Sequence, residues 1–300
     1  MTLVQIVGLA IEASMFLIVF AIGLNATAKD FHYLLRHPAL LARSLLSMNV
    51  IMLVFAVTLV TTFNMHPAVK IALVALACSP VPPILPFKQL KAGGSNEYVI
   101  GLLSATAAAA IVIVPLAIEV IGQAFGLAIH VPASRIAVIV ATTVLLPLVL
   151  GVLARRLAPA IAMKIAHPIA VAATFVLLAA VLPLIVKSFP AFWALVGNGV
   201  VIFLVLFSLL GLAVGHLLGG PDPDIRTTLA LATATRHPAV ALAIATINYP
   251  EQKAVIAVVI WHLIVSAMVA APYVNWRTKL HTAAAPLPQS APAVPRSWGR

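Results

Sequence analysis

Two apolar stretches, each long enough to span a membrane, are interrupted near the middle. The first, residues 71–91, reads IALVALACSPVPPILPFKQLK, and the second, residues 227–245, reads TTLALATATRHPAVALAIA. Proline removes a backbone donor and clashes with the preceding turn, so we expect both helices to open at these points. Backbone groups freed in lipid must meet protein, water or a ligand, and the breaks should therefore face a cavity at mid-membrane. The residues expected to break the helices are Pro80, Pro82, Pro83, Pro86 and Pro238.

The composition places the chain in a membrane. Of its 300 residues, 63% are hydrophobic and 8% are charged, and the mean hydropathy is +1.15. Soluble domains do not have this balance, so the sequence predicts an all-α polytopic membrane protein within a lipid bilayer. The net charge of +11 could suggest nucleic acid, but the basic residues lie mainly in short loops between apolar spans, and no nucleic-acid partner is expected. The single cysteine, Cys78, excludes an intrachain disulfide.

The apolar runs predict nine transmembrane helices. Their approximate ranges are 3–25, 39–63, 67–91, 97–122, 134–154, 165–187, 193–218, 226–247 and 251–275. If the N-terminus is outside, 13 Lys and Arg residues fall on the cytoplasmic side and 4 on the opposite side. This split predicts a multi-pass protein of the plasma (cytoplasmic) membrane with its N-terminus outside and its C-terminus in the cytoplasm.

Domain organisation follows from the same runs. Residues 1–280 are expected to form a single transmembrane transporter domain, and the Ala/Pro-rich residues 281–300 a disordered cytoplasmic tail. The first apolar stretch is interpreted as a retained span, because no basic residue precedes it and it contains Glu12.

The two interrupted stretches occupy matching positions in the two halves of the chain. Spans 1–4 and 6–9 would form two inverted repeats with the fifth span as connector, and the broken helix is the third of each repeat. Interrupted spans in matching positions are a strong sequence indication of a transporter's binding site.

Arg236 is the residue that most constrains this site. Its guanidinium is permanently charged and costs several kcal/mol at the centre of a span, so it must face the bundle interior and find an anion, backbone carbonyls or an acidic partner. One interpretation makes Arg236 the counter-charge for an anionic substrate. The other makes it a brace that bonds carbonyls freed at the two breaks, and the two are compatible. His237 could donate, accept or take up a proton, or fill the unwound turn as a neutral imidazole.

Hydroxyl groups lie close to both breaks. Thr233, Thr235 and Ser79 could contact a substrate, although such residues in apolar helices more often bond their own i−4 carbonyl. Glu12 lies deep within the first span and could be a proton site, a partner for a cation, or a residue in a wet vestibule.

Enzyme motifs are missing from the sequence. It contains no His-Glu-x-x-His, no phosphate loop and no Gly-x-Ser-x-Gly, and its nine histidines are scattered. We therefore expect no catalytic activity, no cofactor and no metal site. His262, next to Trp261, is expected to belong to a packed aromatic pair.

Several motifs in order resemble the bile acid:sodium symporter family. They are Gly23-Leu24…Asp30-Phe31…Arg36-His37-Pro38 after the first span, the proline that follows Cys78-Ser79, and Trp261-His262 in the last span. The likeness in order and spacing covers about residues 5–276. It implies a panel domain, a core domain with two crossing discontinuous helices, and transport of organic anions by alternating access.

The chain departs from the sodium-coupled members of that family at their ion-ligand positions. Where those members carry Gly-Gly, Ser-Asn, Glu, Gln and hydroxyl residues, this chain has apolar residues, prolines and an arginine. The positions here are Val81, Pro82, Leu85, Pro86, Val99, Leu103, Ala232 and Arg236. Apolar side chains offer a hard cation no oxygen, and a fixed positive charge repels it. We therefore hypothesise that the Arg236 guanidinium occupies the space that sodium holds in the coupled relatives.

The sequence thus favours a secondary transporter of a small or amphipathic organic anion that works without sodium. The alternative is a non-transporting receptor or structural membrane protein on a degenerate carrier scaffold. A membrane enzyme is disfavoured by the missing catalytic clusters, and a sodium/proton antiporter by the lack of a deep acidic pair. The sequence leaves the oligomeric state open.

Overall fold

A computed structural model describes residues 3–284, and these residues form helices and no strand. Short helices α2 (Ala28–Phe31) and α3 (Tyr33–Arg36) follow the first long one. Two spans contain a π-helical turn between two α-helical parts. The first consists of α4 (Pro38–Leu45), the π turn η1 (Leu46–Ile51) and α5 (Met52–Thr62). The second consists of α9 (Ala133–Val140), the π turn η2 (Ala141–Leu145) and α10 (Leu146–Leu157). The uninterrupted long helices are α1 (Leu3–Asn25), α8 (Asn96–Phe125), α11 (Pro159–Val196), α12 (Val200–Leu218) and α15 (Ala254–Ala284).

Two predicted spans are built from pairs of shorter helices. The first pair is α6 (Pro67–Cys78) and α7 (Leu85–Lys91), and the second is α13 (Pro223–Ala234) and α14 (Pro238–Asn248). Within residues 3–284, eight segments are long and apolar enough to cross a membrane when α13 and α14 are taken together, and α6 is a shorter apolar helix. The all-α polytopic membrane fold is confirmed, while the number of nine spans and the inverted repeats stay predictions.

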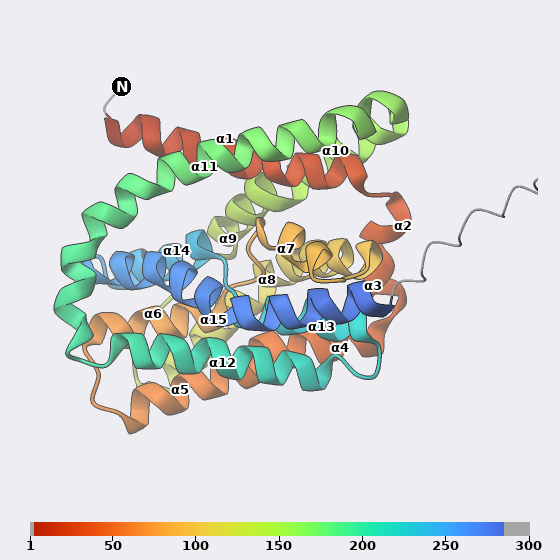
Figure 1. Cartoon of the computed structure of the whole chain (residues 1–300). Helices are drawn as coiled ribbons and strands as arrows, with labels where there is room; N and C mark the ends of the chain where they lie inside the picture. Colours follow the sequence, from red (N-terminus) through yellow and green to blue (C-terminus); the bar gives the residue numbers. More distant parts are fainter. Residues whose placement is uncertain (1–2, 285–300) are drawn as a thin grey trace, which may run out of the picture.

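The loop predicted between the sixth and seventh spans, at residues 188–192, is helical in the structure. Residues 165–187 and 193–218 were expected to be separate spans, but α11 continues from Pro159 to Val196 through three internal prolines. Proline is tolerated inside membrane helices when neighbouring groups satisfy the freed backbone, and it bends the helix. Figure 1 shows α11 curving around one side of the molecule to reach α12.

The C-terminal helix is also longer than expected. It runs from Ala254 to Ala284, so residues 281–284 of the predicted tail are helical, and residues 285–300 lie outside the described part of the chain.

Helices α1, α10 and α11 pack on one another and form a layer that we call the panel, as the first span contacts both of the others. The remaining long helices form a second layer, the core, which lies below the panel in Figure 1. Close approach in the panel depends on glycine, because a Cβ on Gly23 would lie 2.9 Å from the Cα of Gly151. Small residues at helix interfaces are typical of membrane bundles.

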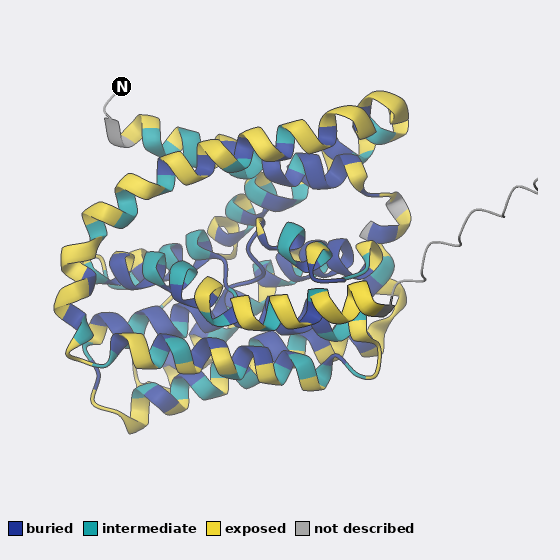
Figure 2. Cartoon of the chain, viewed as in Figure 1, coloured by how far each residue is buried: buried dark blue, intermediate teal, exposed yellow. Residues whose placement is uncertain are grey.

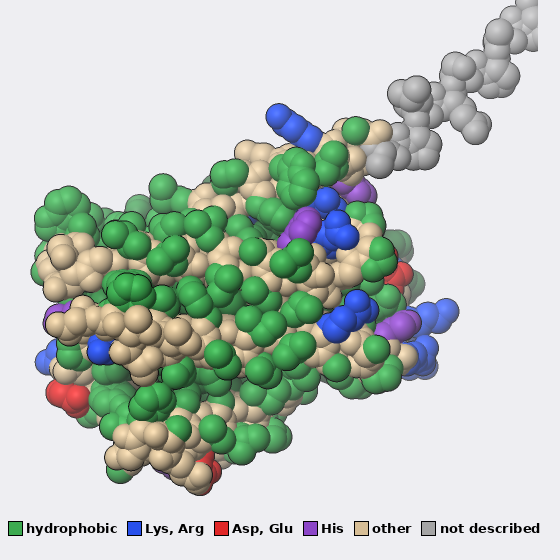
Figure 3. Space-filling model, turned by 90° about the horizontal axis from the view of Figure 1, so that it is seen from below, with side chains coloured by type: hydrophobic (Ala, Val, Ile, Leu, Met, Phe, Trp, Pro, Cys, Tyr) green, Lys and Arg blue, Asp and Glu red, His purple; other side chains and the backbone are tan. Residues whose placement is uncertain are grey.

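The outer surface carries apolar side chains. Exposed residues of α11 include Phe175 (69%), Val186 (66%) and Trp193 (63%), whereas its buried residues are mostly alanines that lie at helical spacing. Figure 2 shows the exposed positions following the outward faces of the panel helices. Hydrophobic side chains cover most of the face seen in Figure 3, and Lys and Arg gather mainly toward one end. This distribution suits a lipid surround with polar ends.

Candidate functional site

The two interrupted helices meet at their breaks. Helix α6 ends at Cys78 and α13 ends at Ala234, and the extended segments that follow them are joined by a backbone hydrogen bond in which His237 N–H donates to Pro80 C=O at 2.9 Å. Both helices thus end where the sequence is interrupted. We call this junction, residues 79–84 together with 235–237, the crossing.

The prolines define where the helices stop and restart. Pro80, Pro82 and Pro83 lie buried in the segment between α6 and α7. Pro86 and Pro238 lie in the first turns of α7 and α14, where a missing N–H removes no intrahelical bond. Each proline therefore either prevents helix formation across the break or begins the next helix.

Arg236 is completely buried in the crossing. Its Nη1 donates to the carbonyl oxygen of Ser79 at 3.2 Å, and its Nη2 donates to the carbonyl oxygen of Met48 at 2.7 Å. Its Cζ lies 6.0 Å from the centroid of the Phe207 ring. Ser79 is the first residue after α6, so one of the carbonyls freed at the first break receives a proton donor from the second break. This geometry matches the brace described from the sequence.

The second carbonyl comes from a π-helical turn. Met48 lies in η1, and a π turn displaces the backbone from the regular α-helical hydrogen-bond ladder. A π turn also supplies the neighbour of His237, because Thr143 of η2 has its Oγ1 3.4 Å from His237 Nε2. His237 is buried, and its Nδ1 has no hydrogen-bond partner among the described residues. Both charged or titratable side chains of the crossing therefore contact a π turn.

The three hydroxyl residues named from the sequence behave differently. Ser79 Oγ donates to Ala75 C=O at 2.7 Å and Thr235 Oγ1 donates to Leu231 C=O at 2.8 Å, both within their own helices. Thr233 also bonds its own helix, but in addition its Oγ1 lies 2.7 Å from Ser47 Oγ of η1. The structure thus links the end of α13 to η1 through a hydroxyl pair, whereas Ser79 and Thr235 make local bonds.

Glu12 does not belong to the crossing. It is exposed on α1, in the panel, and forms no hydrogen bond or ion pair with any residue of the described part of the chain.

Trp261 and His262, which are adjacent in α15, contact different aromatic rings. Trp261 stacks on Phe192 of α11, with ring centroids 4.7 Å apart, while His262 lies edge-on to Phe207 at 5.6 Å.

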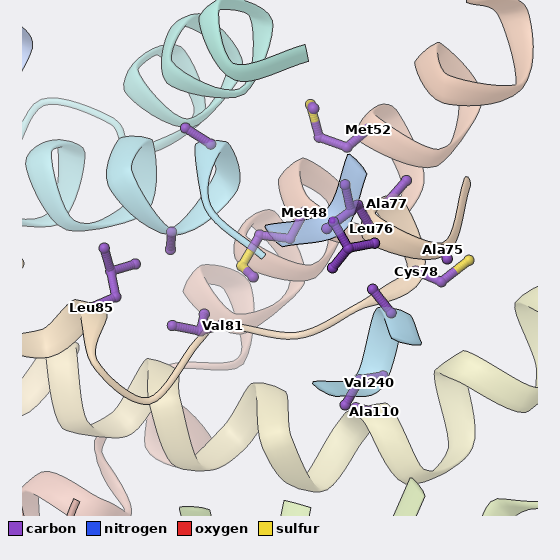
Figure 4. Packing of buried hydrophobic residues seen from close by; sticks show 14 of the residues in the cluster. Met48, Met52, Ala75, Leu76, Ala77, Cys78, Val81, Leu85, Ala110 and Val240 are labelled. Carbon is purple, nitrogen blue, oxygen red and sulfur yellow. The ribbon is translucent and has the colours of Figure 1, made fainter. Parts of the chain in front are cut away.

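The positions that the sequence resemblance aligns with sodium ligands hold buried apolar residues. Val81, Leu85 and Ala232 are at most 4% exposed, and Val99 and Leu103 are equally buried on α8. Figure 4 shows Val81 and Leu85 in the extended segment and the start of α7, with Met48 nearby. Among residues 3–284 no three His, Cys, Asp or Glu side chains lie together as they would around a metal ion.

Sequence reasoning missed Met48 and Thr143. Both lie in predicted continuous spans, and neither a proline nor a charged residue marks the π turns that hold them. It also missed Gly211 of α12, where a Cβ would lie 2.6 Å from the Cα of Ala234. That glycine allows α12 to lie directly against the end of α13.

Two opened helices that cross inside a polytopic bundle define a class of membrane transporters in which the break is the binding region. The comparison with known families agrees with this class. The sequence model described as the Sodium Bile acid symporter family matches residues 13–193, more than half of the chain. The chain therefore belongs to the sodium bile acid symporter family and is a membrane transporter of that type. No curated protein matches the chain.

Proposed function

We propose that this protein is a secondary transporter of a small or amphipathic organic anion that works by alternating access without sodium coupling. The observation that carries the proposal is the guanidinium of Arg236, bonded to the carbonyl oxygens of Ser79 and Met48 inside the crossing.

Arg236 takes over a structural task that a bound cation can perform at two opened helices. Carbonyl oxygens freed by helix breaks need a positive partner in a dry environment, and here that partner is a side chain that cannot dissociate. A sodium ion near Arg236 would be repelled by a unit charge in a low-dielectric interior. The apolar side chains of Val81, Leu85 and Ala232 supply no oxygen to offset that repulsion.

The same charge favours an anion as substrate. No carboxylate forms an ion pair with Arg236 among the described residues, so its charge is offset by two carbonyl dipoles and the face of the Phe207 ring rather than by an anion. A negatively charged solute that approaches the crossing gains attraction from this charge. Thr235 and Pro238, which are half-buried next to Arg236, are where we expect the solute to approach.

The first experiment is uptake into proteoliposomes from a panel of organic anions, with sodium present or replaced by choline. We expect saturable flux that is equal in the two media. A requirement for sodium would contradict the coupling mechanism, and a lack of flux for every anion would favour a non-transporting receptor on the same scaffold.

A thermal-shift screen identifies the substrate class and tests the role of Arg236. Anions that are transported should raise the thermal midpoint of the native protein and have less effect on Arg236→Lys and Arg236→Ala. Arg156→Ala, which removes an exposed guanidinium from α10, is the matched control and should respond like the native protein. Equal shifts in all four proteins would exclude Arg236 from anion recognition.

A further inference from the structure

An open pocket of about 730 Å³ lies between α7 and the last turns of α15, away from the crossing. Its polar lining consists of Lys88, Lys91, Asn275, Thr278, Lys279 and Thr282. We call it the lysine pocket. The rest of the lining is apolar, with Val274 and Ala283 on α15.

The pocket concentrates positive charge without neutralising it. Its three ammonium groups come from two separate helices, and none of them forms an ion pair with a residue in the range 3–284. The amide of Asn275 adds further hydrogen-bond donors, whereas the hydroxyls of Thr278 and Thr282 already donate to the carbonyl oxygens of Lys91 and Thr278. This set of groups suits a phosphate, because Lys binds phosphate oxygens as a point charge and the Asn275 amide can donate to a remaining oxygen.

The walls of the pocket are held in place. Thr278 Oγ1 donates to Lys91 C=O at 3.4 Å, which ties the end of α7 to α15. Arg277 donates from Nε to Thr227 Oγ1 at 2.7 Å and from Nη2 to Pro223 C=O at 2.9 Å, which ties α15 to the first turn of α13. These bonds hold α15 against α7, which supplies the other wall of the pocket, and against α13.

An exposed apolar strip runs beside the pocket on the same helix. Trp276 is 48% exposed and Leu280 is 45% exposed, and their i, i+4 spacing places them on one face of α15. Asn275 and Lys279, which line the pocket, each directly precede a residue of this strip, so the strip lies on the adjacent face of α15. Trp276 also packs against the rings of His216 and Tyr273, at 5.8 and 5.7 Å. Aromatic side chains grouped in this way are typical of the membrane interface.

We propose that the lysine pocket binds the headgroup of an anionic phospholipid whose acyl chains lie along Trp276 and Leu280. Basic pockets between membrane helices bind anionic lipid headgroups in this manner. A water-soluble anion would use the lysines but would gain nothing from the apolar strip. Residues 285–300 are a poor alternative occupant, because they carry Arg296 and Arg300 and no acidic side chain. The proposal does not depend on the transport function.

Lipid titration of the purified full chain tests the proposal. Phosphatidylglycerol should raise its thermal midpoint more than phosphatidylcholine does, and should be retained preferentially in native mass spectra. In the double variant Lys88→Gln/Lys279→Gln, affinity for phosphatidylglycerol should fall by at least about tenfold, since each lysine near an anionic headgroup contributes to binding. The matched control is Lys29→Gln/Lys164→Gln, which removes the same charge from exposed positions outside the pocket and should bind like the native protein.

Two further arms separate the possible occupants. Leu280→Gln should weaken phosphatidylglycerol binding while every lysine of the pocket remains, and inorganic phosphate and glycerol 3-phosphate should give no comparable shift. Equal shifts with free phosphate would mean that the pocket takes a soluble anion and would overturn the lipid proposal. Equal responses to the two lipids, or an unchanged response in Lys88→Gln/Lys279→Gln, would overturn it as well. So would a lipid preference that arises only after residues 285–300 are deleted.

Discussion

The guanidinium of Arg236 donates from Nη2 to the carbonyl oxygen of Met48 at 2.7 Å, across 188 positions of sequence separation. Met48 belongs to η1 in the first half of the chain, and Arg236 to the second break. Because Nη1 also reaches Ser79 C=O at 3.2 Å, a single side chain joins three segments: η1, the first break and the second break. The crossing is thus stabilised by a fixed cation.

Removal of Arg236 should strongly destabilise the protein. In Arg236→Ala the carbonyls of Ser79 and Met48 remain buried without these donors, and each such group costs about 1–3 kcal/mol. Arg236→Lys keeps the charge but lacks the planar guanidinium with its several donors, so its loss of stability should be smaller but measurable. The apparent thermal midpoint in detergent measures both effects. A midpoint in Arg236→Ala equal to that of Arg156→Ala would contradict the brace.

Thr233→Val should lower the free energy of unfolding more than Thr235→Val does. The Thr233 hydroxyl lies 2.7 Å from Ser47 Oγ of another helix, whereas the Thr235 hydroxyl bonds only Leu231 C=O in its own helix. Loss of the buried interhelical bond should lower the free energy of unfolding by about 1 kcal/mol. Denaturant or thermal unfolding of the two variants in parallel gives the comparison. Equal destabilisation would show that the contact with Ser47 contributes nothing.

Gly211→Ala should disturb the end of α13. The added Cβ would lie 2.6 Å from the Cα of Ala234 and 2.8 Å from the carbonyl oxygen of Thr233, both backbone atoms that cannot rotate away. Overpacking of this kind costs about 1–3 kcal/mol. Gly197→Ala serves as the control, since a Cβ there meets nothing within 4 Å. We expect a lower thermal midpoint and slower anion flux for Gly211→Ala only, and a native midpoint for Gly211→Ala would refute the close contact.

Trp261 joins the core to the panel and its replacement should weaken that contact. Its ring stacks on Phe192 of α11 at 4.7 Å with an interplanar angle of 9°, and its Nε1 donates to Ser188 Oγ at 3.2 Å. Trp261→Phe retains a stacked ring and loses only the hydrogen bond, while Trp261→Ala loses both, including about 0.5–1.5 kcal/mol from the aromatic pair. Thermal unfolding should therefore rank native above Trp261→Phe above Trp261→Ala. Identical midpoints for the two variants would show that the ring stack with Phe192 does not contribute to stability.

Some features of the site were predictable because they depend on local chemistry. The prolines after Cys78 and Pro238 after Arg236-His237 disfavour a continuous helix, because each lacks a backbone donor and its ring clashes with the preceding turn. Their effect is the same in the structure, where α6 and α13 end at Cys78 and Ala234. Prolines did not have this effect in α11, which continues through Pro168, Pro183 and Pro190. There the surrounding protein and lipid, rather than the local sequence, decide between a bend and a break.

The amino-acid sequence by itself determined the membrane class, the family and the positions of the two breaks, because hydropathy and proline act locally on a chain in lipid. Only the tertiary structure decided which groups satisfy the opened backbone. Met48 and Thr143 became partners of Arg236 and His237 through π turns that no local signal marks, and Gly211 set how closely α12 approaches α13. The physical reason is that most buried polar groups are stabilised by a hydrogen-bond partner, and that partner is supplied by packing between segments far apart in the chain.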